Sequence, residues 1–206
     1  MRIAVLVYGR LNHCAEHYNN IKDSIGRQND IDFFMSSDNS DESLLNDFIR
    51  YYKPKLYTNS PIHYDYDIGI YPGKRPESNI HRMTCHFINK NRVLSLFEEY
   101  IHSTSIQYDI VMSLRIDCVF HNNFVFNKLE ENTIYIPSGR DYVDKGINDQ
   151  IAYGNVDVMR KYNSINLVNL LEQKLSIPHS ENLNYANIHL NNLKIERFNL
   201  GYYLHR

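Results

Sequence analysis

The chain has 206 residues, of which 43% are hydrophobic, and its formal net charge at pH 7 is -2. A sequence of this length buries a full hydrophobic core, and because no linker rich in Pro, Gly or Ser interrupts it, we expect residues 1–206 to form one domain. A nearly balanced charge excludes a general attraction for nucleic acid or for an anionic membrane surface. Any anionic ligand must therefore be bound by a local cluster of basic residues.

Cysteine usage and hydropathy restrict the cellular setting. Cys14, Cys85 and Cys118 are odd in number and lack the spacing of a metal site, which favours a reducing cytosol over a disulfide framework. The apolar run over residues 1–8 has no small-residue cleavage site, and no stretch approaches the length of a membrane span. We expect a cytoplasmic protein that does not insert into membranes.

Strand and helix patterns alternate through the first half of the chain. The continuous apolar run from Ile3 to Tyr8, closed by Gly9, predicts a strand buried on both faces, and helical spacing follows over residues 13–27. The next predicted elements are a strand over 31–35, a helix ending near residue 51, a strand over 55–58, a long helix over 79–101 and a strand over 108–117. This order predicts an α/β fold with a mixed, mostly parallel central sheet and helices on both faces.

The remaining segments are less regular. Residues 59–78 contain three prolines, two glycines and three tyrosines, which predicts either a functional loop or a surface loop packed by its own rings. Beyond the central strand we expect a strand over 133–137, one or two helices over 155–175, a helix over 181–190 and a strand over 194–198.

Polar residues follow three of the predicted parallel strands. The three segments are Tyr8-Gly9-Arg10, Ser36-Ser37-Asp38 and Arg115-Ile116-Asp117. Ligands of open α/β sheets bind at the carboxyl ends of the strands, so these segments predict one shared cleft. Arginine suits phosphate, and a carboxylate beside a phosphate indicates a divalent cation such as Mg²⁺ or Mn²⁺ between the two anions. The strand ends therefore predict a site for a phosphate-bearing ligand.

Each of these residues also has a purely structural explanation. Asp117 is equally able to cap the loop that follows it, and Arg115, which points to the same face, is placed to form a plain ion pair with Asp117. Gly9 is a common turn residue after a strand, and the sequence has neither a Gly-x-Gly-x-x-Gly nor a Gly-x-x-x-x-Gly-Lys-Ser/Thr pattern. A dinucleotide-binding fold of the usual kind is therefore disfavoured.

Four segments together resemble one class of enzymes. They are Val5-Leu6-Val7-Tyr8-Gly9-Arg10, the helix over 79–100, the strand over 108–117 and the phrase Asn148-Asp149-Gln150-Ile151-Ala152-Tyr153-Gly154. This arrangement resembles the GT-A class of nucleotide-sugar glycosyltransferases, above all the small chlorovirus-like enzymes that large DNA viruses use on capsid glycans, and related bacterial surface-polysaccharide enzymes. The resemblance implies a GT-A, Rossmann-like fold with a nucleotide-binding half over 1–117 and an acceptor and catalytic half over 118–206. For a viral protein it implies the host cytoplasm.

The resemblance also implies a metal site. Arg115-Ile116-Asp117 stands where most such enzymes have Asp-x-Asp, so Asp117 is expected to ligate Mn²⁺ (or Mg²⁺) that bridges the donor phosphates. Arg115 would then contact ribose or phosphate, which leaves the metal with fewer protein carboxylates. Either water or a histidine completes the coordination, and His205 or His189 is the candidate. The alternative for such a histidine is an uninvolved surface residue.

The same resemblance implies which residues bind the nucleotide. Tyr8, Gly9, Arg10 and Asp38 fall where the class holds the nucleoside. Arg82 on the long helix is expected to reach a phosphate, and its alternative is a position on a solvated helix face.

Sugar transfer needs a base as well as a stabilised leaving group. A metal ion and arginines stabilise the charge that develops on the nucleoside diphosphate, while a carboxylate activates the acceptor hydroxyl. Asp149 is the predicted base, with Asp141 or Asp144 as substitutes and a helix cap or turn as the structural alternative. A base at this position implies an inverting enzyme, whereas a retaining enzyme would not need one.

The sequence therefore predicts a hexosyltransferase-type enzyme that moves a sugar from a nucleoside-diphosphate sugar, first of all a UDP-sugar, to a glycan or a protein-linked glycan. A nucleotidyltransferase acting on sugar phosphates is the first alternative, disfavoured because the loop after strand one has a single glycine. A non-catalytic domain that binds nucleotides or sugars is the second, with tyrosines at 64, 66 and 71 stacking on sugar rings. Release of UDP from a UDP-sugar discriminates among the three.

Overall fold

The fold is built around a central β-sheet with helices packed against it. The computed structural model describes residues 1–38, 40–64, 77–142, 146–172 and 179–205. Its strands are β1 (Arg2–Tyr8), β2 (Asp30–Ser37), β3 (Leu56–Asn59), β4 (Ile110–Arg115), β5 (Cys118–Phe120), β6 (Thr133–Pro137), β7 (Ile151–Gly154), β8 (Lys194–Phe198) and β9 (Tyr202–Leu204). Its helices are α1 (Cys14–Ile25), α2 (Glu42–Tyr52), α3 (Glu77–Thr104), α4 (Val156–Asn163), α5 (Leu167–Glu172) and α6 (Ser180–Leu190).

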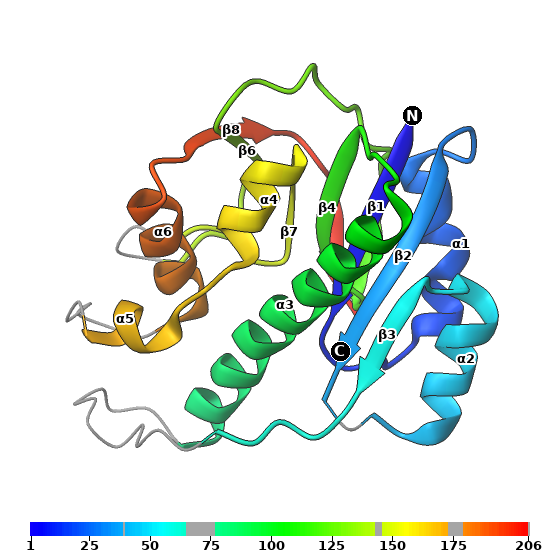
Figure 1. The fold of residues 1–206 in the computed structure, drawn as a ribbon, viewed down its shortest axis with the longest axis horizontal. Helices are drawn as coiled ribbons and strands as arrows, with labels where there is room; N and C mark the ends of the chain where they lie inside the picture. Colours follow the sequence, from blue (N-terminus) through cyan, green and yellow to red (C-terminus); the bar gives the residue numbers. More distant parts are fainter. Residues whose placement is uncertain (39, 65–76, 143–145, 173–178, 206) are drawn as a thin grey trace.

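β1 lies near the middle of a seven-stranded sheet with the order β3-β2-β1-β4-β7-β6-β8 (Figure 1). Its residues from Ile3 to Tyr8 are all buried, as expected for an apolar run that is covered on both faces. β1 pairs in parallel with β2 and with β4, and β2 pairs in parallel with β3. The first four strands therefore end at the same edge of the sheet.

The two faces of β1 pack against different helices. Its odd-numbered residues from Ile3 to Val7 share a core with α1 and α2, whereas its even-numbered residues from Ala4 to Tyr8 share a core with α3 and α4. Figure 1 shows α3 crossing in front of the strands. Phe97 anchors this helix, and burying such a ring stabilises the fold by roughly 1.5–3 kcal/mol. No helix within the described ranges is both long and apolar enough to cross a membrane.

The second half of the chain adds antiparallel pairing. β7 pairs antiparallel with β4 and with β6, and β8 pairs in parallel with β6, so the sheet is mixed but mostly parallel. Because two antiparallel pairings separate β6 from β4, β6 runs in the same direction as β4 and ends at the same edge. β5 and β9 form a separate two-stranded antiparallel sheet.

The predicted α/β fold with a mixed, mostly parallel sheet is confirmed. The predicted region 155–175 contains two helices, α4 and α5, and the Asn155 side chain caps α4 by accepting from the Val158 N–H at 2.9 Å. Three short strands, β5, β7 and β9, were not predicted. Of the irregular segment 59–78, residues 65–76 lie outside the described residues.

Candidate functional site

Polar side chains gather at the edge of the sheet where the first strands end. In the register of the sheet, Tyr8 lies beside Ser36 of β2 and beside Arg115 of β4. The Ser36 hydroxyl donates to Asn89 Oδ1 of α3 at 2.7 Å, which holds this helix against the edge. The segments predicted to share a cleft are therefore neighbours in the structure.

Gly9 makes the turn that leaves β1. Its N–H donates to the Ser36 carbonyl at 3.1 Å, and its φ of 104° lies where residues with a side chain are strained. A Cβ at this position would meet no atom within 4 Å, so open space lies beside the turn. A ligand can approach the backbone here without displacing a side chain.

Arg115 and Asp117 form an ion pair with two hydrogen bonds at the end of β4. The Nε and Nη2 atoms of Arg115 donate to the two carboxylate oxygens of Asp117 at 3.1 and 2.5 Å. Burial by itself would lower the pKa of Arg115, but the charges of Asp117 and Asp149 outweigh burial and raise it. The ion pair named as the structural alternative is thus present, and the end of β4 carries a permanent cation.

This pairing bears on the metal site that the resemblance implies. Both oxygens of Asp117 already accept hydrogen bonds from Arg115. In the part of the chain that the structure describes, two groups of three side chains place possible ligand atoms within 4.8 Å of one another: His13, Glu16 and His205, and Asp38, His81 and Cys85. Neither group contains Asp117. The surroundings of Asp117 do not fit a Mn²⁺ site in this conformation, and we assign no step to a metal there.

Asp149, the predicted base, is only 2% exposed. Its Oδ2 lies 3.4 Å from Nε2 of His86, and its backbone carbonyl accepts from the Tyr8 hydroxyl at 2.6 Å. Burial alone would raise the pKa of Asp149, but the basic groups around it lower the pKa, and Arg115 keeps its charge at every relevant pH. A lowered pKa keeps Asp149 ionised, as a base must be, but makes it a weaker base, and burial separates it from an acceptor in this conformation; the base role stays a prediction.

The two substitutes named for the base have different surroundings. Asp141 follows β6, pairs with Arg197 at 2.8 Å and accepts from the Asn148 N–H at 2.9 Å. Its side chain is 43% exposed. Asp144 lies outside the described residues. Asp141 is therefore far more accessible to an acceptor than Asp149.

Two basic side chains of α3 were missed by the sequence analysis. Burial lowers the pKa of His86 to about 3 and that of Lys90 to about 7. Lys90 is fully buried, with Nζ 3.4 Å from Asn184 Oδ1. The available signal was their spacing, because residues four apart share a helix face and a lysine among core positions needs a buried partner. With Arg115 and Asp149, these two residues form what we call the buried charge cluster.

Lys90 is expected to give the protein an unusual pH dependence of stability. Its pKa is about 7 in the folded protein and 10.5 in ordinary surroundings, so between these values the unfolded chain binds the extra proton. The free energy of unfolding should therefore rise as the pH rises from about 7 towards 10.5, and Lys90→Met should lack this rise. Urea unfolding across this pH range measures both proteins. An equal rise in the two would contradict the expectation.

Tyr8 is a buried structural residue. It is 1% exposed, and its ring packs edge-on against His86 with 5.1 Å between the ring centroids. Its hydroxyl also lies 3.2 Å from the Gln150 carbonyl. The buried ring offers no face to a nucleoside in this conformation, so the predicted nucleoside contact of Tyr8 stays a prediction. Tyr8 ties the end of β1 to the segment before β7.

The other predicted nucleotide-binding residues are more accessible. Asp38 is half-buried and accepts from the Ile62 N–H at 2.9 Å, which fixes the segment after β3. Arg10 is exposed. Burial and Asp38 raise the pKa of the Cys85 thiol, and the charge of Arg10 opposes this rise. Arg82 is exposed on α3, one turn before the buried charge cluster. The two arginines add exposed cations to this region.

His205 reaches the end of β4 through its backbone. Because β9 pairs with β5, the His205 N–H donates to the Asp117 carbonyl at 2.9 Å. Its imidazole faces α1, where Nδ1 lies 3.0 Å from Nε2 of His17. The alternative candidate, His189, is exposed on α6. The structure thus brings His205 close to Asp117 but turns its ring towards other histidines.

An open hollow of about 660 Å³, which no sequence motif predicted, lies near the ends of β2 and β3. It is lined by Ser40, Asp41, Glu42, Leu45 and Asn59. The Asn59 side chain accepts from the Ser40 N–H at 2.8 Å and donates to the Ser40 carbonyl at 2.9 Å, which fixes the rim. Ligand pockets are typically roughly 300–1,000 Å³, and the volume of this open hollow lies within that range.

Comparison with known proteins identifies the fold. No protein-family model matches the chain, and no curated protein matches its sequence. The apo-form glycosyltransferase GlyE of Streptococcus pneumoniae TIGR4 aligns with a TM-score of 0.53 and 11% identity, over 94% of this chain and 44% of GlyE. The galactosyltransferase LgtC, solved with donor and acceptor sugar analogs, aligns with a TM-score of 0.51 and 13% identity, over 96% of this chain and 73% of LgtC.

These matches show that the chain has the GT-A fold of nucleotide-sugar glycosyltransferases, as its motifs predicted. A glycosyltransferase involved in the glycosylation of the major capsid of PBCV-1 aligns over 97% of this chain and 82% of that one, at 8% identity. The TM-score of this alignment is 0.46. The chain spans less than half the length of GlyE.

Proposed function

We propose that the protein is a glycosyltransferase that moves a hexose from a nucleoside-diphosphate sugar, first of all a UDP-sugar, to a glycan acceptor. The observation that supports this proposal is the polar edge of the sheet. There the open turn at Gly9 and the Arg115–Asp117 pair lie at the carboxyl ends of adjacent parallel strands. Open α/β sheets bind their ligands at this edge. LgtC, which has the same fold, was solved with donor and acceptor sugar analogs.

Arg115 is the residue that we assign to the leaving group. As the sugar departs, negative charge grows on the nucleoside diphosphate, and a preorganised cation stabilises that charge. Asp117 holds two of the five N–H donors of the guanidinium, and the remaining donors are left for phosphate oxygens. Asp117 is therefore a positioning residue, and the charge of Asp149 helps to keep Arg115 in place.

The two substrates are proposed to lie on either side of β4. The hollow near the ends of β2 and β3 has the volume for a nucleoside, so we place the nucleoside of the donor on that side. β6 ends at the same edge on the other side of β4, and the accessible carboxylate of Asp141 follows it. We place the acceptor there, with Asp141 as the carboxylate that faces it.

Release of UDP tests the proposal. The full chain is incubated with a panel of nucleotide sugars and Mn²⁺, and free nucleoside diphosphate is measured. We expect turnover of at least one UDP-sugar. Asp117→Ala should lower kcat/KM by about 10- to 100-fold, because it frees the guanidinium that the carboxylate orients.

Asp157→Ala is the matched control, because Asp157 also pairs with an arginine but its side chain is 81% exposed on α4. It should leave turnover unchanged. If no nucleotide sugar is turned over and none raises Tm, the proposal fails. Release of pyrophosphate from UTP and a sugar phosphate would identify a nucleotidyltransferase instead.

A further inference from the structure

Three histidines and a glutamate meet beside the start of α1. His13 precedes the helix, His17 lies in its first turn, and His205 follows β9. The rings of His13 and His205 stack with their centroids 4.0 Å apart, and Nε2 of His17 lies 3.0 Å from Nδ1 of His205. Glu16 joins them, with Oε1 3.3 Å from Nδ1 of His13. The proposed transfer uses none of these four side chains.

The local fold explains this convergence. His13 has a left-handed backbone with φ 58°, and Glu16 follows three residues later on the same face of the first turn. His205 is held from the other side by its N–H bond to the Asp117 carbonyl. The side chains come from a helix and from a separately paired strand. Their meeting is therefore set by tertiary structure.

The hydrogen bond between His17 and the Ile116 carbonyl fixes one ring proton. Nδ1 of His17 lies 2.9 Å from the Ile116 carbonyl, and because a carbonyl only accepts, this nitrogen carries the proton. With one proton on its ring, His17 accepts at Nε2 from Nδ1 of His205. Nε2 of His205 is left with a lone pair, which is the form that a metal ion requires.

We propose that His13, Glu16 and His205 bind a zinc-class divalent ion and that His17 is the positioning residue of this site. The possible ligand atoms of the three side chains all lie within 4.8 Å of one another. Zinc bonds to nitrogen and oxygen are roughly 2.0–2.2 Å long, so small rotations of the partly exposed His13 and the exposed Glu16 bring these atoms into range. Two imidazoles and one carboxylate form an open zinc site, whereas Mg²⁺ and Mn²⁺ prefer oxygen ligands.

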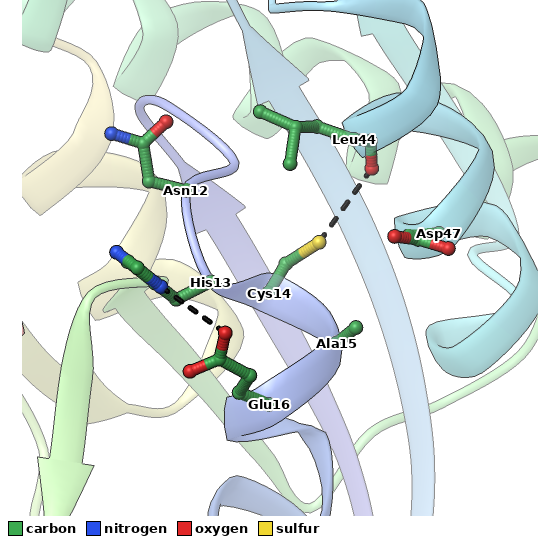
Figure 2. A pocket seen from close by; sticks show the side chains of 7 residues that line it. All are labelled: Asn12, His13, Cys14, Ala15, Glu16, Leu44 and Asp47. Carbon is green, nitrogen blue, oxygen red and sulfur yellow. Dashed lines mark hydrogen bonds and ion pairs between the residues drawn. The ribbon is translucent and has the colours of Figure 1, made fainter.

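Two of the proposed ligands are accessible to an ion from solvent. Figure 2 shows His13 and Glu16 turned towards one another at the rim of a pocket, and an open volume of about 260 Å³ lies there. Their side chains are 35% and 66% exposed. Two of the three proposed ligands, His13 and Glu16, line this pocket.

The second ligand group of the described chain is a weaker candidate. Burial raises the pKa of the Cys85 thiol to about 12, and a thiol binds zinc only as the thiolate. Asp38 and Cys85 also hydrogen-bond to each other, so the site would have to release that contact. Cys85→Ser therefore serves as a control for the zinc experiments.

A bound ion would connect α1 to the segment after β9. That segment is bonded to the Asp117 carbonyl, and His17 is bonded to the Ile116 carbonyl. The ion would therefore stiffen the backbone of the Arg115-Ile116-Asp117 segment without contacting the Asp117 carboxylate. Its main effect is expected on stability, which is measured without any sugar substrate.

Zinc binding by the full chain tests the proposal. Zn²⁺ or Mg²⁺ alone is added to metal-free protein, and Tm and the binding stoichiometry are measured. We expect one zinc per chain and a Tm increase of roughly 5–10 °C when zinc exceeds its Kd about 100-fold. Mg²⁺ should produce no comparable increase. Co²⁺ should give the visible absorption of an ion bound by imidazole in an open site.

The variants separate the ligands from their surroundings. His13→Asn is chosen because asparagine tolerates the left-handed backbone, and Glu16→Gln preserves size. Each should abolish the cobalt spectrum, and His17→Gln should weaken binding by about 10- to 100-fold. Cys85→Ser and His121→Ala change side chains outside the proposed ligand set. Both variants should therefore bind one zinc with unchanged affinity.

Three results would overturn the proposal. Unchanged zinc affinity in both His13→Asn and His205→Ala would show that the ion binds elsewhere. Loss of binding in Cys85→Ser would locate the site at the other ligand group. Equal Tm increases with Zn²⁺ and Mg²⁺ would show that the site does not prefer an ion that binds imidazole. Glu16 is exposed, so Glu16→Gln keeps the test decisive if a histidine variant does not fold.

Discussion

Replacing Arg115 with methionine is expected to lower the free energy of unfolding by about 3–5 kcal/mol, because the permanent cation beside two carboxylates is removed. Asp117 loses hydrogen bonds of 3.1 and 2.5 Å. Asp149, which is 2% exposed, loses a charge that lowers its pKa. A buried carboxylate without compensation is costly. Urea unfolding measures the loss as a lower midpoint at an unchanged slope.

Arg160 provides the matched control for this prediction. It also bridges two carboxylates, Glu98 and Asp157, at 2.8 Å each, but its side chain is 43% exposed. Arg160→Met should therefore cost less than about 1 kcal/mol. Adding Asp149→Asn to the Arg115 variant should recover most of the loss, because the buried negative charge disappears. The account is wrong if the double variant is no more stable than the single one.

The first half of the fold was predictable because its strands carry their own signal. β1 is buried on both faces, so its apolar run is unbroken and is recognised without knowledge of its neighbours. β7 is equally buried but has four residues and follows the polar segment Asn148-Asp149-Gln150, so its pattern was obscured. β5 and β9 have three residues each and exist because Cys118 pairs with Leu204. Pairing over such a separation leaves no local pattern.

Only those positions of the candidate site that follow from the direction of the strands were predictable from the sequence. Parallel strands must end together, which is why Gly9 and Arg115 were expected at one edge. The direction of the Tyr8 ring was not predicted, because it depends on which face of β1 α3 covers. Lys90 was missed for the same reason, since the crossing of α3 over the sheet selects which side chains reach the buried charge cluster.

The base prediction shows a different limit. The motif around Asp149 drew attention to this carboxylate, but its burial and its charged neighbours are properties of the tertiary structure. Those neighbours lower the pKa of Asp149, which weakens it as a base, and its burial keeps an acceptor hydroxyl away in this conformation. The prediction of inversion rested on this base and stays a prediction. Asp141, 43% exposed, is where a carboxylate base would now be sought.

Arg115→Lys is expected to lower kcat/KM for donor turnover by about 10²- to 10³-fold, which is the usual cost of losing one preorganised donor to a developing negative charge. Lysine keeps the positive charge, so Asp117 and Asp149 remain compensated and the fold should stay within about 1 kcal/mol of the wild-type stability. Its ammonium group cannot make the two parallel bonds to Asp117 and also present fixed donors to a diphosphate. The substitution therefore removes the two-bond geometry of the guanidinium but keeps its positive charge.

The control is Arg82→Lys, an exposed arginine on α3. An exposed cation acts mainly by its charge, so this variant should lose less than about tenfold in kcat/KM. Turnover and urea unfolding are measured on both variants beside Arg115→Met. If Arg115→Lys turns over the donor as fast as the wild type, any cation at the end of β4 is sufficient and the two bonds to Asp117 serve the fold alone. If it is as slow as Arg115→Met but fully stable, the guanidinium itself is what the leaving group requires.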